Sequence, residues 1–415
     1  MPLFTRLSPS RPTAWQGWLC ASRASVSIAF MMYAGAVPQL IDAWSMSAAQ
    51  AGLVQTGFNA GYAGSLVLTG WLADRMGAKR VLLWSSLATA LVGILVAVFA
   101  RSFEAGLVLF TLLGLSQGGT YTPAIMMVAQ GVDRARRGAA IGLLLAGASF
   151  GYAVSIALST ALSQLAGYEV AFLVCGVVPT LSAIAAWLGS TGRPNIVPEK
   201  AGGRPIPAPR GDRRAAAMLT LGYTAHCWEL LGMWAWMPAF LLTSIALSDG
   251  AASAGVLAQG LWIGVVIHMS GCLAAFTMGR ASDRFGRRAV LICLALLGAG
   301  CSFSVGLLQD LPSPVLLAFA ALYGFAVIGD SPVLSTAMTE TVAPSALGAA
   351  LALRSILGFG AGGLAPLAFG AVRDAVSPEL GWAMGFAALG VGGLLAALFA
   401  VLLPKSRRPA PSRLS

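Results

Sequence analysis

The chain has 415 residues, of which 57% are apolar and only 10% are charged, against roughly a quarter charged in an average soluble domain. A single hydrophobic core stops growing beyond about 250–300 residues, so a water-soluble protein of this length could not bury so much apolar surface. The net charge of +11 does not indicate nucleic-acid binding, because the Lys and Arg residues lie in short stretches between apolar runs. The composition therefore predicts a membrane protein.

Apolar runs long enough to cross a hydrocarbon layer of ~30 Å as helices follow one another along the chain. The alternating ten-residue segments of outer-membrane strands are missing from the sequence. The first six predicted helices are 17–42, 50–72, 80–100, 105–131, 138–163 and 169–190, and the second six are 216–244, 254–280, 288–308, 313–341, 345–371 and 381–403.

The segment between the two sets is rich in Pro, Gly, Arg and Lys and is typical of a flexible linker. The prediction is an all-α membrane protein of twelve transmembrane helices in two six-helix bundles. The bundles cover residues 1–190 and 215–415, and a cytoplasmic linker covers 191–214.

The positions of the basic residues predict the orientation in the membrane. With the N-terminus inside, 22 of the 26 Lys and Arg residues fall in the even-numbered loops, the linker and the two ends. Such an excess marks the cytoplasmic side. Arginine also outnumbers lysine by 23 to 3, which is typical of a GC-rich bacterial genome. We therefore expect a multi-pass protein of the bacterial inner membrane with both termini in the cytoplasm.

A loop motif follows the second predicted helix and recurs, in degenerate form, after the eighth at an offset of 209 residues. Glycines permit a tight turn and close helix packing, and a carboxylate suits a neighbouring helix N-terminus. The repeat predicts a duplicated six-helix unit, although a simple positively charged topology anchor is an alternative role for the loop. The motif residues are Gly70, Asp74, Arg75, Gly77, Lys79 and Arg80 in the first copy and Gly279, Asp283, Arg284, Gly286 and Arg287 in the second.

With these two motifs and its six-linker-six layout, the chain resembles the major facilitator superfamily over essentially its whole length. The resemblance implies two pseudo-symmetric bundles, with the first, fourth, seventh and tenth helices lining a central cavity. It also implies that Asp74 meets the start of the eleventh helix and braces the outward-open state. Drug/proton antiporters of this family carry an arginine in the fourth helix, where this chain has Gln117, and a Gly-Pro pair in the fifth, where it has Gly151 and Tyr152. Multidrug export is therefore disfavoured.

Few ionisable side chains fall within the predicted helices, where they are costly and mark candidate functional sites. Glu229 lies near the middle of its helix, and His226, Asp330 and Arg354 lie roughly 4–6 Å to the cytoplasmic side of their helix midpoints. These three could form one polar layer between the halves. The candidate substrate-binding residues are Tyr33, Gln117, Tyr121, His226, Trp228, Asp330 and Arg354.

The chemistry of these residues leaves alternatives open. Arg354 is either a bidentate anchor for an organic anion or the ion-pair partner of Asp330. Glu229 is the first candidate for the proton carrier, because burial favours the neutral form of a carboxyl group. His226 and Asp330 are the other candidates for proton coupling.

Other intramembrane residues receive structural interpretations. We expect Arg23 to snorkel towards the inner surface and His268 to be structural. Glycines in the predicted helices 105–131 and 345–371 indicate close packing, with hinge motion as a second hypothesis.

The sequence thus predicts a secondary active transporter and no enzyme. It would move a small organic solute, specifically an organic anion, by alternating access, coupled to protons as in a symporter. Proton-driven efflux of a hydrophobic drug-like compound is an alternative, and a non-transporting membrane sensor with the transporter fold is an alternative of another class. The expected partners are the solute, protons and the lipid bilayer, for a monomer that binds no nucleic acid, no cofactor and no metal.

Overall fold

The structure is a computed structural model that describes residues 14–197, 212–249, 256–342 and 344–404. Within these ranges, the side chains of 134–139, 246–249, 256–261 and 344–349 are left undescribed. Most of the predicted linker and both basic ends lie outside the described residues.

The first half of the molecule, α1 to α8, contains the first six predicted spans. The fourth span is formed by α4, η1 and α5 together, and the sixth by α7 and α8. The elements are α1 (Ala14–Ala43), α2 (Ala48–Met76), α3 (Ala78–Phe99), α4 (Phe103–Gln117), the 3-10 turn η1 (Gly118–Thr120), α5 (Thr122–Gly131), α6 (Arg134–Ala166), α7 (Tyr168–Val177) and α8 (Pro179–Ser190).

The second half, α9 to α15, contains the last six spans, and its eleventh span is divided into α13 and α14. The elements are α9 (Arg213–Asp249), α10 (Val256–Phe285), α11 (Arg287–Val305), α12 (Ser313–Thr341), α13 (Pro344–Gly362), α14 (Ala365–Ala375) and α15 (Pro378–Leu402).

Nine helical stretches in the described residues are long and apolar enough to cross a membrane. They include the combined stretches Tyr168–Ser190 and Ala350–Ala375, and the remaining predicted spans correspond to α2, α4 with α5, and α9. Large apolar side chains such as Trp84, Phe150 and Phe276 are exposed on the outside of the bundle, as expected for surfaces that face lipid. The prediction of an all-α, twelve-span membrane protein is confirmed.

Two spans are interrupted where small residues bring backbones together. The Gly118 N–H donates to Ser65 Oγ of α2 (3.0 Å), and a Cβ atom on Gly114 or Gly118 would overlap the α2 backbone. The eleventh span breaks after Gly362 and restarts at α14, whose second residue is Pro366, a position where the missing N–H costs nothing. Gly114, Gly118 and Gly362 therefore allow close packing, and hinge motion stays a hypothesis.

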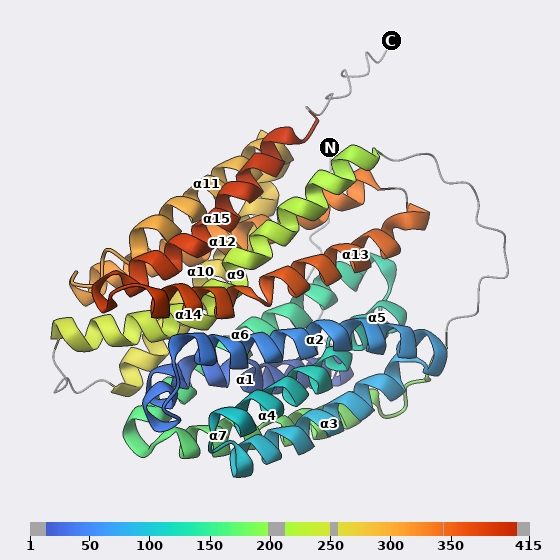
Figure 1. The fold of residues 1–415 in the computed structure, drawn as a ribbon. Helices are drawn as coiled ribbons and strands as arrows, with labels where there is room; N and C mark the ends of the chain where they lie inside the picture. The colour runs from blue at the N-terminus through green and yellow to red at the C-terminus, as the bar shows by residue number, and fades with distance from the viewer. Residues whose placement is uncertain (1–13, 198–211, 250–255, 343, 405–415) are drawn as a thin grey trace, which may run out of the picture.

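The two halves meet at one end of the molecule. We call the helix ends from which residues 191–197 leave the linker side, and the opposite ends the far side. Figure 1 shows the halves in contact on the far side, where α14 lies against α2, and diverging towards the linker side, where α5 and the starts of α9 and α13 lie.

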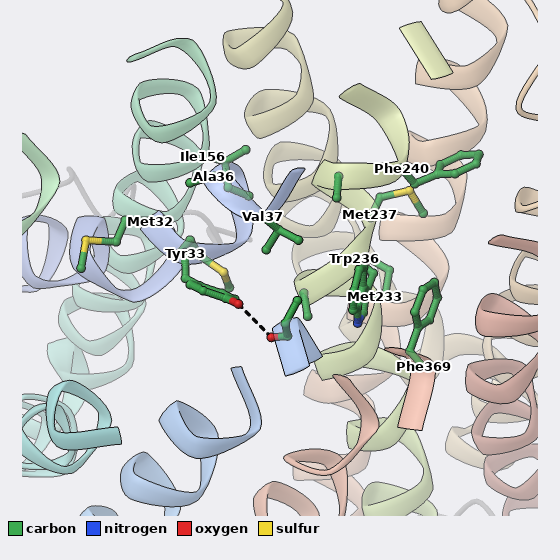
Figure 2. Packing of buried hydrophobic residues seen from close by; sticks show 14 of the residues in the cluster. Met32, Tyr33, Ala36, Val37, Ile156, Met233, Trp236, Met237, Phe240 and Phe369 are labelled. Carbon is green, nitrogen blue, oxygen red and sulfur yellow. Dashed lines mark hydrogen bonds between the residues drawn. The ribbon is translucent and has the colours of Figure 1, made fainter. Parts of the chain in front are cut away.

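Buried apolar side chains from both halves fill the far-side contact. Met32 and Val37 of α1 and Met233 of α9 belong to one cluster (Figure 2). Two side chains also donate hydrogen bonds to backbone carbonyls: the Tyr33 hydroxyl to Ala51 O (2.9 Å) and the Trp236 indole to Pro366 O (3.0 Å). The far side is therefore closed by closely packed apolar side chains from both halves.

A carboxylate of the second half caps a helix of the first half at this contact. Asp374, in the last turn of α14, accepts hydrogen bonds from Ala48 N (2.8 Å) and Ala49 N (2.7 Å). The Ser47 hydroxyl accepts from Gln50 N (3.2 Å). The first N–H groups of a helix have no partner within the helix, and a negative charge is favoured there by the helix dipole. Asp374 therefore stabilises the closed far side.

We predict that Asp374→Asn opens the far side. The loss of the charge-assisted cap costs about 1 kcal/mol, which shifts the ratio of closed to open molecules about fivefold. The measurement is double electron–electron resonance between spin labels at Glu104→Cys and Asp310→Cys, in a chain whose six native cysteines are replaced by alanine. We expect a population with a longer distance between the labels.

Glu379→Gln is the matched control, because this exposed carboxylate bonds Ser377 of its own turn. Equal distance distributions for Asp374→Asn and Glu379→Gln would contradict the role of Asp374.

Candidate functional site

A histidine–aspartate pair joins α9 to α12. His226 Nδ1 lies 2.8 Å from Asp330 Oδ1, and its Nε2 lies 2.9 Å from the Ser331 hydroxyl. His226 and Asp330 are both at least 95% buried. Since imidazole and carboxylate can each hold or release a proton, the two residues can share one across this contact.

The sequence predicts Arg354 of α13 at about the same membrane depth as this pair, but Arg354 does not bind Asp330. Its guanidinium stacks on the Tyr223 ring, with Cζ 4.1 Å from the ring centroid, and Nη2 donates to Ser335 Oγ (3.2 Å). Its Nε and Nη1 are buried without a hydrogen-bond partner among the described residues. The alternative of an Asp330–Arg354 ion pair is wrong here, because His226 takes the carboxylate and leaves the guanidinium with free N–H groups.

Arg23 of α1 is the clearest correction to the sequence analysis, which expected it to snorkel to the surface. It is 4% exposed and points into the first half, where Nη2 donates to the Tyr152 hydroxyl (3.3 Å) and Nη1 to Thr120 Oγ1 (3.4 Å). Its Cζ lies 5.1 Å from the Tyr121 ring centroid, and Tyr62 contacts it as well. These phenol groups hold the side chain at depth, so it does not reach the surface.

Tyr121 connects the two guanidinium groups across the interface between the halves. It lies at the end of η1 and interacts electrostatically with Arg23 of its own half and with Arg354 of the other. Gln117, one turn earlier, is fully buried, and neither of its amide atoms has a partner among the described residues. The first half therefore contributes polar groups with unused hydrogen-bonding capacity at this level.

Aromatic side chains continue from this region along the interface between the halves. The Tyr152 ring of α6 lies 5.8 Å from Trp234 of α9 and 5.6 Å from His268 of α10. His268 is buried among these rings, which agrees with a packing role. Tyr33 lies farther towards the far side, where its hydroxyl bonds Ala51 O, and it is separate from the layer that contains Arg354.

Glu229 lies inside the second half. Ser302 Oγ of α11 donates to Glu229 Oε1 (2.5 Å) and lies 2.5 Å from the Tyr323 hydroxyl of α12. A Cβ atom on Gly393 of α15 would come against the Glu229 carboxylate. Glu229 is thus surrounded by α11, α12 and α15, and the structure does not bring it to the His226–Asp330 pair.

Trp228 also turns away from the interface between the halves. Its indole donates to Ala388 O of α15 (2.9 Å), and its ring packs at Gly392. The structure therefore places Trp228, a candidate substrate-binding residue, against α15 and away from the other half.

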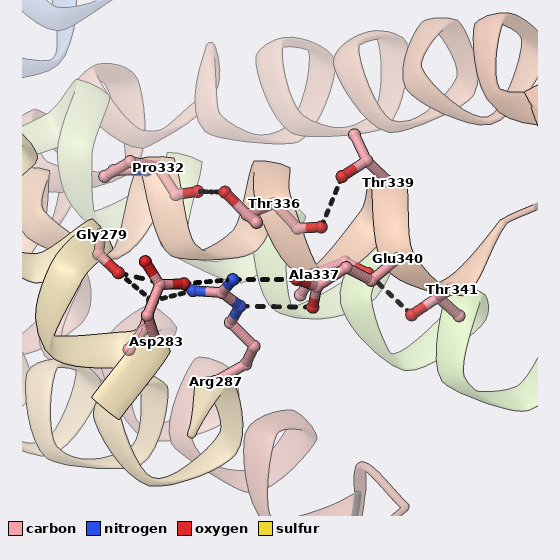
Figure 3. A network of polar contacts seen from close by, with 10 residues as sticks. Gly279, Asp283, Arg287, Pro332, Thr336, Ala337, Thr339, Glu340 and Thr341 are labelled. Atoms are coloured by element: carbon pink, nitrogen blue, oxygen red, sulfur yellow. Dashed lines mark hydrogen bonds and ion pairs between the residues drawn. The ribbon is translucent and has the colours of Figure 1, made fainter. Parts of the chain in front are cut away.

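The second copy of the loop motif forms a closed polar network on the linker side (Figure 3). Arg287 Nη2 lies 2.6 Å from Asp283 Oδ1 and 2.8 Å from Glu340 Oε1, and Nη1 donates to Gly279 O (3.4 Å). Gly286 has φ +92°, a conformation that favours glycine. The motif ties α10, α11 and α12 together, while the Arg284 guanidinium stacks on the Phe285 ring.

The first copy has the same backbone turn with different partners. Gly77 has φ +88°, Lys79 Nζ donates to Arg193 O (2.8 Å), and Arg75 stacks on Trp71. Arg80 N donates to Asn195 Oδ1 (3.4 Å), and a Cβ atom on Gly70 would meet open space.

Asp74 is exposed, and its expected partners at the start of α13 have undescribed side chains. The bracing role of Asp74 therefore stays a prediction.

The roles of two residues, one in the site and one in the far-side contact, were missed by the sequence analysis. Arg23 carried the signal of an arginine two turns inside an apolar helix, but its tyrosine partners come from three other helices. Asp374 carried no signal beyond its position at the end of a helix. In the part of the chain that the structure describes, no group of three His, Cys, Asp or Glu residues is arranged to hold a metal ion.

Comparison with known proteins places this geometry in context. The family model described as Major Facilitator Superfamily matches residues 19–271 and 259–415. A probable 4-methylmuconolactone transporter of Cupriavidus pinatubonensis is 27% identical over 78% of this chain and 75% of its own length. The cis,cis-muconate transport protein of Acinetobacter baylyi is 25% identical over 86% of each chain.

Solved structures show the same fold. A bacterial homologue of the human lysosomal transporter Spinster, solved in an inward-facing and unoccupied conformation, superposes with a TM-score of 0.73 at 19% identity, over 95% of this chain and 97% of that one.

We predict that Ser302 is essential to the stability of the second half. Ser302→Ala leaves the buried Glu229 carboxyl and Tyr323 hydroxyl without their shared partner, at a cost of about 1–3 kcal/mol. Ser304→Ala is the control on the same helix, because its hydroxyl bonds only Gly300 O within α11, and we expect a loss below about 0.5 kcal/mol. Thermal unfolding in detergent measures both, and equal losses would contradict the buried network.

Proposed function

The chain belongs to the Major Facilitator Superfamily, and from this premise we propose that it is a proton-coupled transporter of organic anions. Membership makes it a multi-pass membrane protein that carries a small solute, and excludes an enzyme. The solute class, the coupling and the orientation are the proposed parts.

The observation that supports the anion proposal is that Arg354 is buried without a counter-charge from the described residues and with unpaired N–H donors. The residue is 8% exposed, and its Nε and Nη1 donors have no partner among the described residues. A buried cation without a counter-charge is costly, whereas a carboxylate can accept two parallel hydrogen bonds from a guanidinium. A bound organic acid would supply the missing charge.

The named relatives support this solute class. The printed names of the two relatives above refer to 4-methylmuconolactone and cis,cis-muconate, which are small organic acids with unsaturated carbon skeletons. Tyr121 and Tyr223 lie against Arg23 and Arg354, and Trp234 packs on Tyr152. Aromatic side chains of this kind suit such a skeleton. We propose an unsaturated or aromatic organic acid as the solute.

Alternating access by rocking of the two halves fits the far-side contact. The excess of basic residues on the linker side favours the cytoplasm as its location, so the closed far side would be the periplasmic side of a bacterial inner membrane. We further propose that residues 1–190 and 215–415 are the two moving units.

Arg354→Gln is predicted to weaken anion binding about tenfold to a hundredfold, since it removes a charged hydrogen-bond donor. Ligand-induced thermal stabilisation by cis,cis-muconate and 4-methylmuconolactone measures the affinity, and Arg354→Lys should fall between the two. Arg101→Gln is the matched control, because Arg101 bonds only carbonyl groups at the end of its own helix. Unchanged binding of every acid by Arg354→Gln would remove the basis of the anion proposal.

Proton coupling is proposed to run through His226 and Asp330. The pair lies on the helices that carry Tyr223 and Ser335, the two partners of Arg354. A solute anion at Arg354 would therefore alter the electrostatic environment of the pair. Glu229 is enclosed by the second half and bonded to Ser302, which favours a structural role over proton transfer.

Asp330→Asn is predicted to abolish uphill accumulation in proteoliposomes with an imposed pH gradient, while solute counterflow at equal pH continues. Glu229→Gln is the paired variant and should retain accumulation within about threefold. The reverse pattern, with accumulation lost only in Glu229→Gln, would assign the proton to Glu229 instead.

Proton-driven efflux of a hydrophobic compound would be favoured by Asp330 and Glu229 standing unpaired between the halves. His226 and Ser302 occupy them instead, so we do not adopt that alternative.

A further inference from the structure

Arg23 presents the same electrostatic problem as Arg354, in the opposite half. All of its partners are uncharged, and they are Thr120, Tyr62, Tyr121 and Tyr152. Its hydrogen bonds to Tyr152 and Thr120 are long (3.3 and 3.4 Å), and its Nε has no partner among the described residues. No carboxylate of the described residues lies within ion-pair distance of it. An arginine that is only 4% exposed under these conditions needs a counter-charge from outside the chain.

The surroundings of Arg23 suit recognition better than packing. Tyr62, Tyr121 and Tyr152 fix the guanidinium without neutralising it, so its charge remains available. Phenol rings also offer flat apolar faces beside hydroxyl donors.

The two guanidinium groups belong to one region. Tyr121 interacts electrostatically with both Arg23 and Arg354, and Tyr223, on which Arg354 stacks, interacts with Tyr121. Arg23 lies over the Tyr121 ring of the first half, and Arg354 lies over the Tyr223 ring of the second. A solute between the tyrosines would have one cation at each end.

We propose that Arg23 is a second anion-binding residue, and that the solute is a dianion whose two acidic groups are bound by Arg23 in the first half and Arg354 in the second. This inference rests on the proposed anion transport and narrows it to an elongated dicarboxylate or a similar doubly charged acid. Each half binds one end of the solute, and a solute with a single charge satisfies only one of the two buried cations.

The test compares dicarboxylates with their half-esters on the full-length protein. Succinate, glutarate, adipate and terephthalate are each paired with the monomethyl ester, and binding is measured by thermal stabilisation in detergent. For the best-fitting acid, we expect the dicarboxylate to bind the wild type about tenfold to a hundredfold more tightly than its half-ester. Equal affinity of acid and half-ester throughout the series would overturn the proposal without any variant.

The variants assign the second charge to Arg23. Arg23→Gln should reduce dicarboxylate affinity to that of the half-ester and leave half-ester affinity within about threefold, while Arg23→Lys recovers part of the difference. If Arg23 has a purely structural role, Arg23→Gln would weaken the binding of dicarboxylate and half-ester equally or leave both unchanged. Either result overturns the proposal. If Arg23→Gln fails to fold, Tyr152→Phe is the second variant, because it removes the hydrogen bond to Arg23 Nη2. It should change the ratio of dicarboxylate affinity to half-ester affinity, and an unchanged ratio overturns the proposal.

The outcomes separate this inference from the proposed function. Suppose that monoanions bind in an Arg354-dependent way, while Arg23→Gln does not change dicarboxylate affinity relative to half-ester affinity. Anion transport is then retained and the dianion proposal is rejected. If no acid in the series binds and Arg354→Gln changes nothing, both fall.

Discussion

The cost of placing a charge within the hydrocarbon layer shapes this molecule more than any other constraint. Each ionisable side chain at depth must be neutralised, hydrogen-bonded or supplied with a counter-charge. His226 and Asp330 are paired with one another, and Glu229 is bonded through Ser302. Arg23 and Arg354 are held only by uncharged groups. The protein has thus solved this problem internally for its carboxylates and has left it open for two of its cations.

Hydropathy and charge pattern were sufficient to predict the fold, because spans and short loops are determined by solvent preference along the chain. The predicted helix 17–42 corresponds to Ala14–Ala43, and the predicted 381–403 to Pro378–Leu402. The interruptions within the spans could not be predicted from the same pattern. The turn at Gly118 depends on its contact with Ser65 of another helix, and sequence spacing contains no information about that neighbour.

The sequence predicted the depth of the site residues along their helices, but not the neighbouring helices that their side chains contact. His226, Trp228 and Glu229 lie within one turn of α9, yet they contact α12, α15 and α11 respectively. Helical spacing gives the angle between these side chains, whereas the packing of the surrounding helices decides which one meets the other half. Arg23 shows the same limit: about 13 Å from the start of α1 at 1.5 Å per residue, it is held inside by tyrosines that the sequence places far away.

The cap formed by Asp374 on α2 has a consequence for how such contacts evolve. Both of its partners are backbone N–H groups, which every residue except proline provides. The cap itself therefore requires no particular side chain at positions 48 and 49, so paired substitutions would not record it in aligned sequences. An interaction between the two halves can in this way be maintained by a single side chain, invisible to methods that search for coupled change.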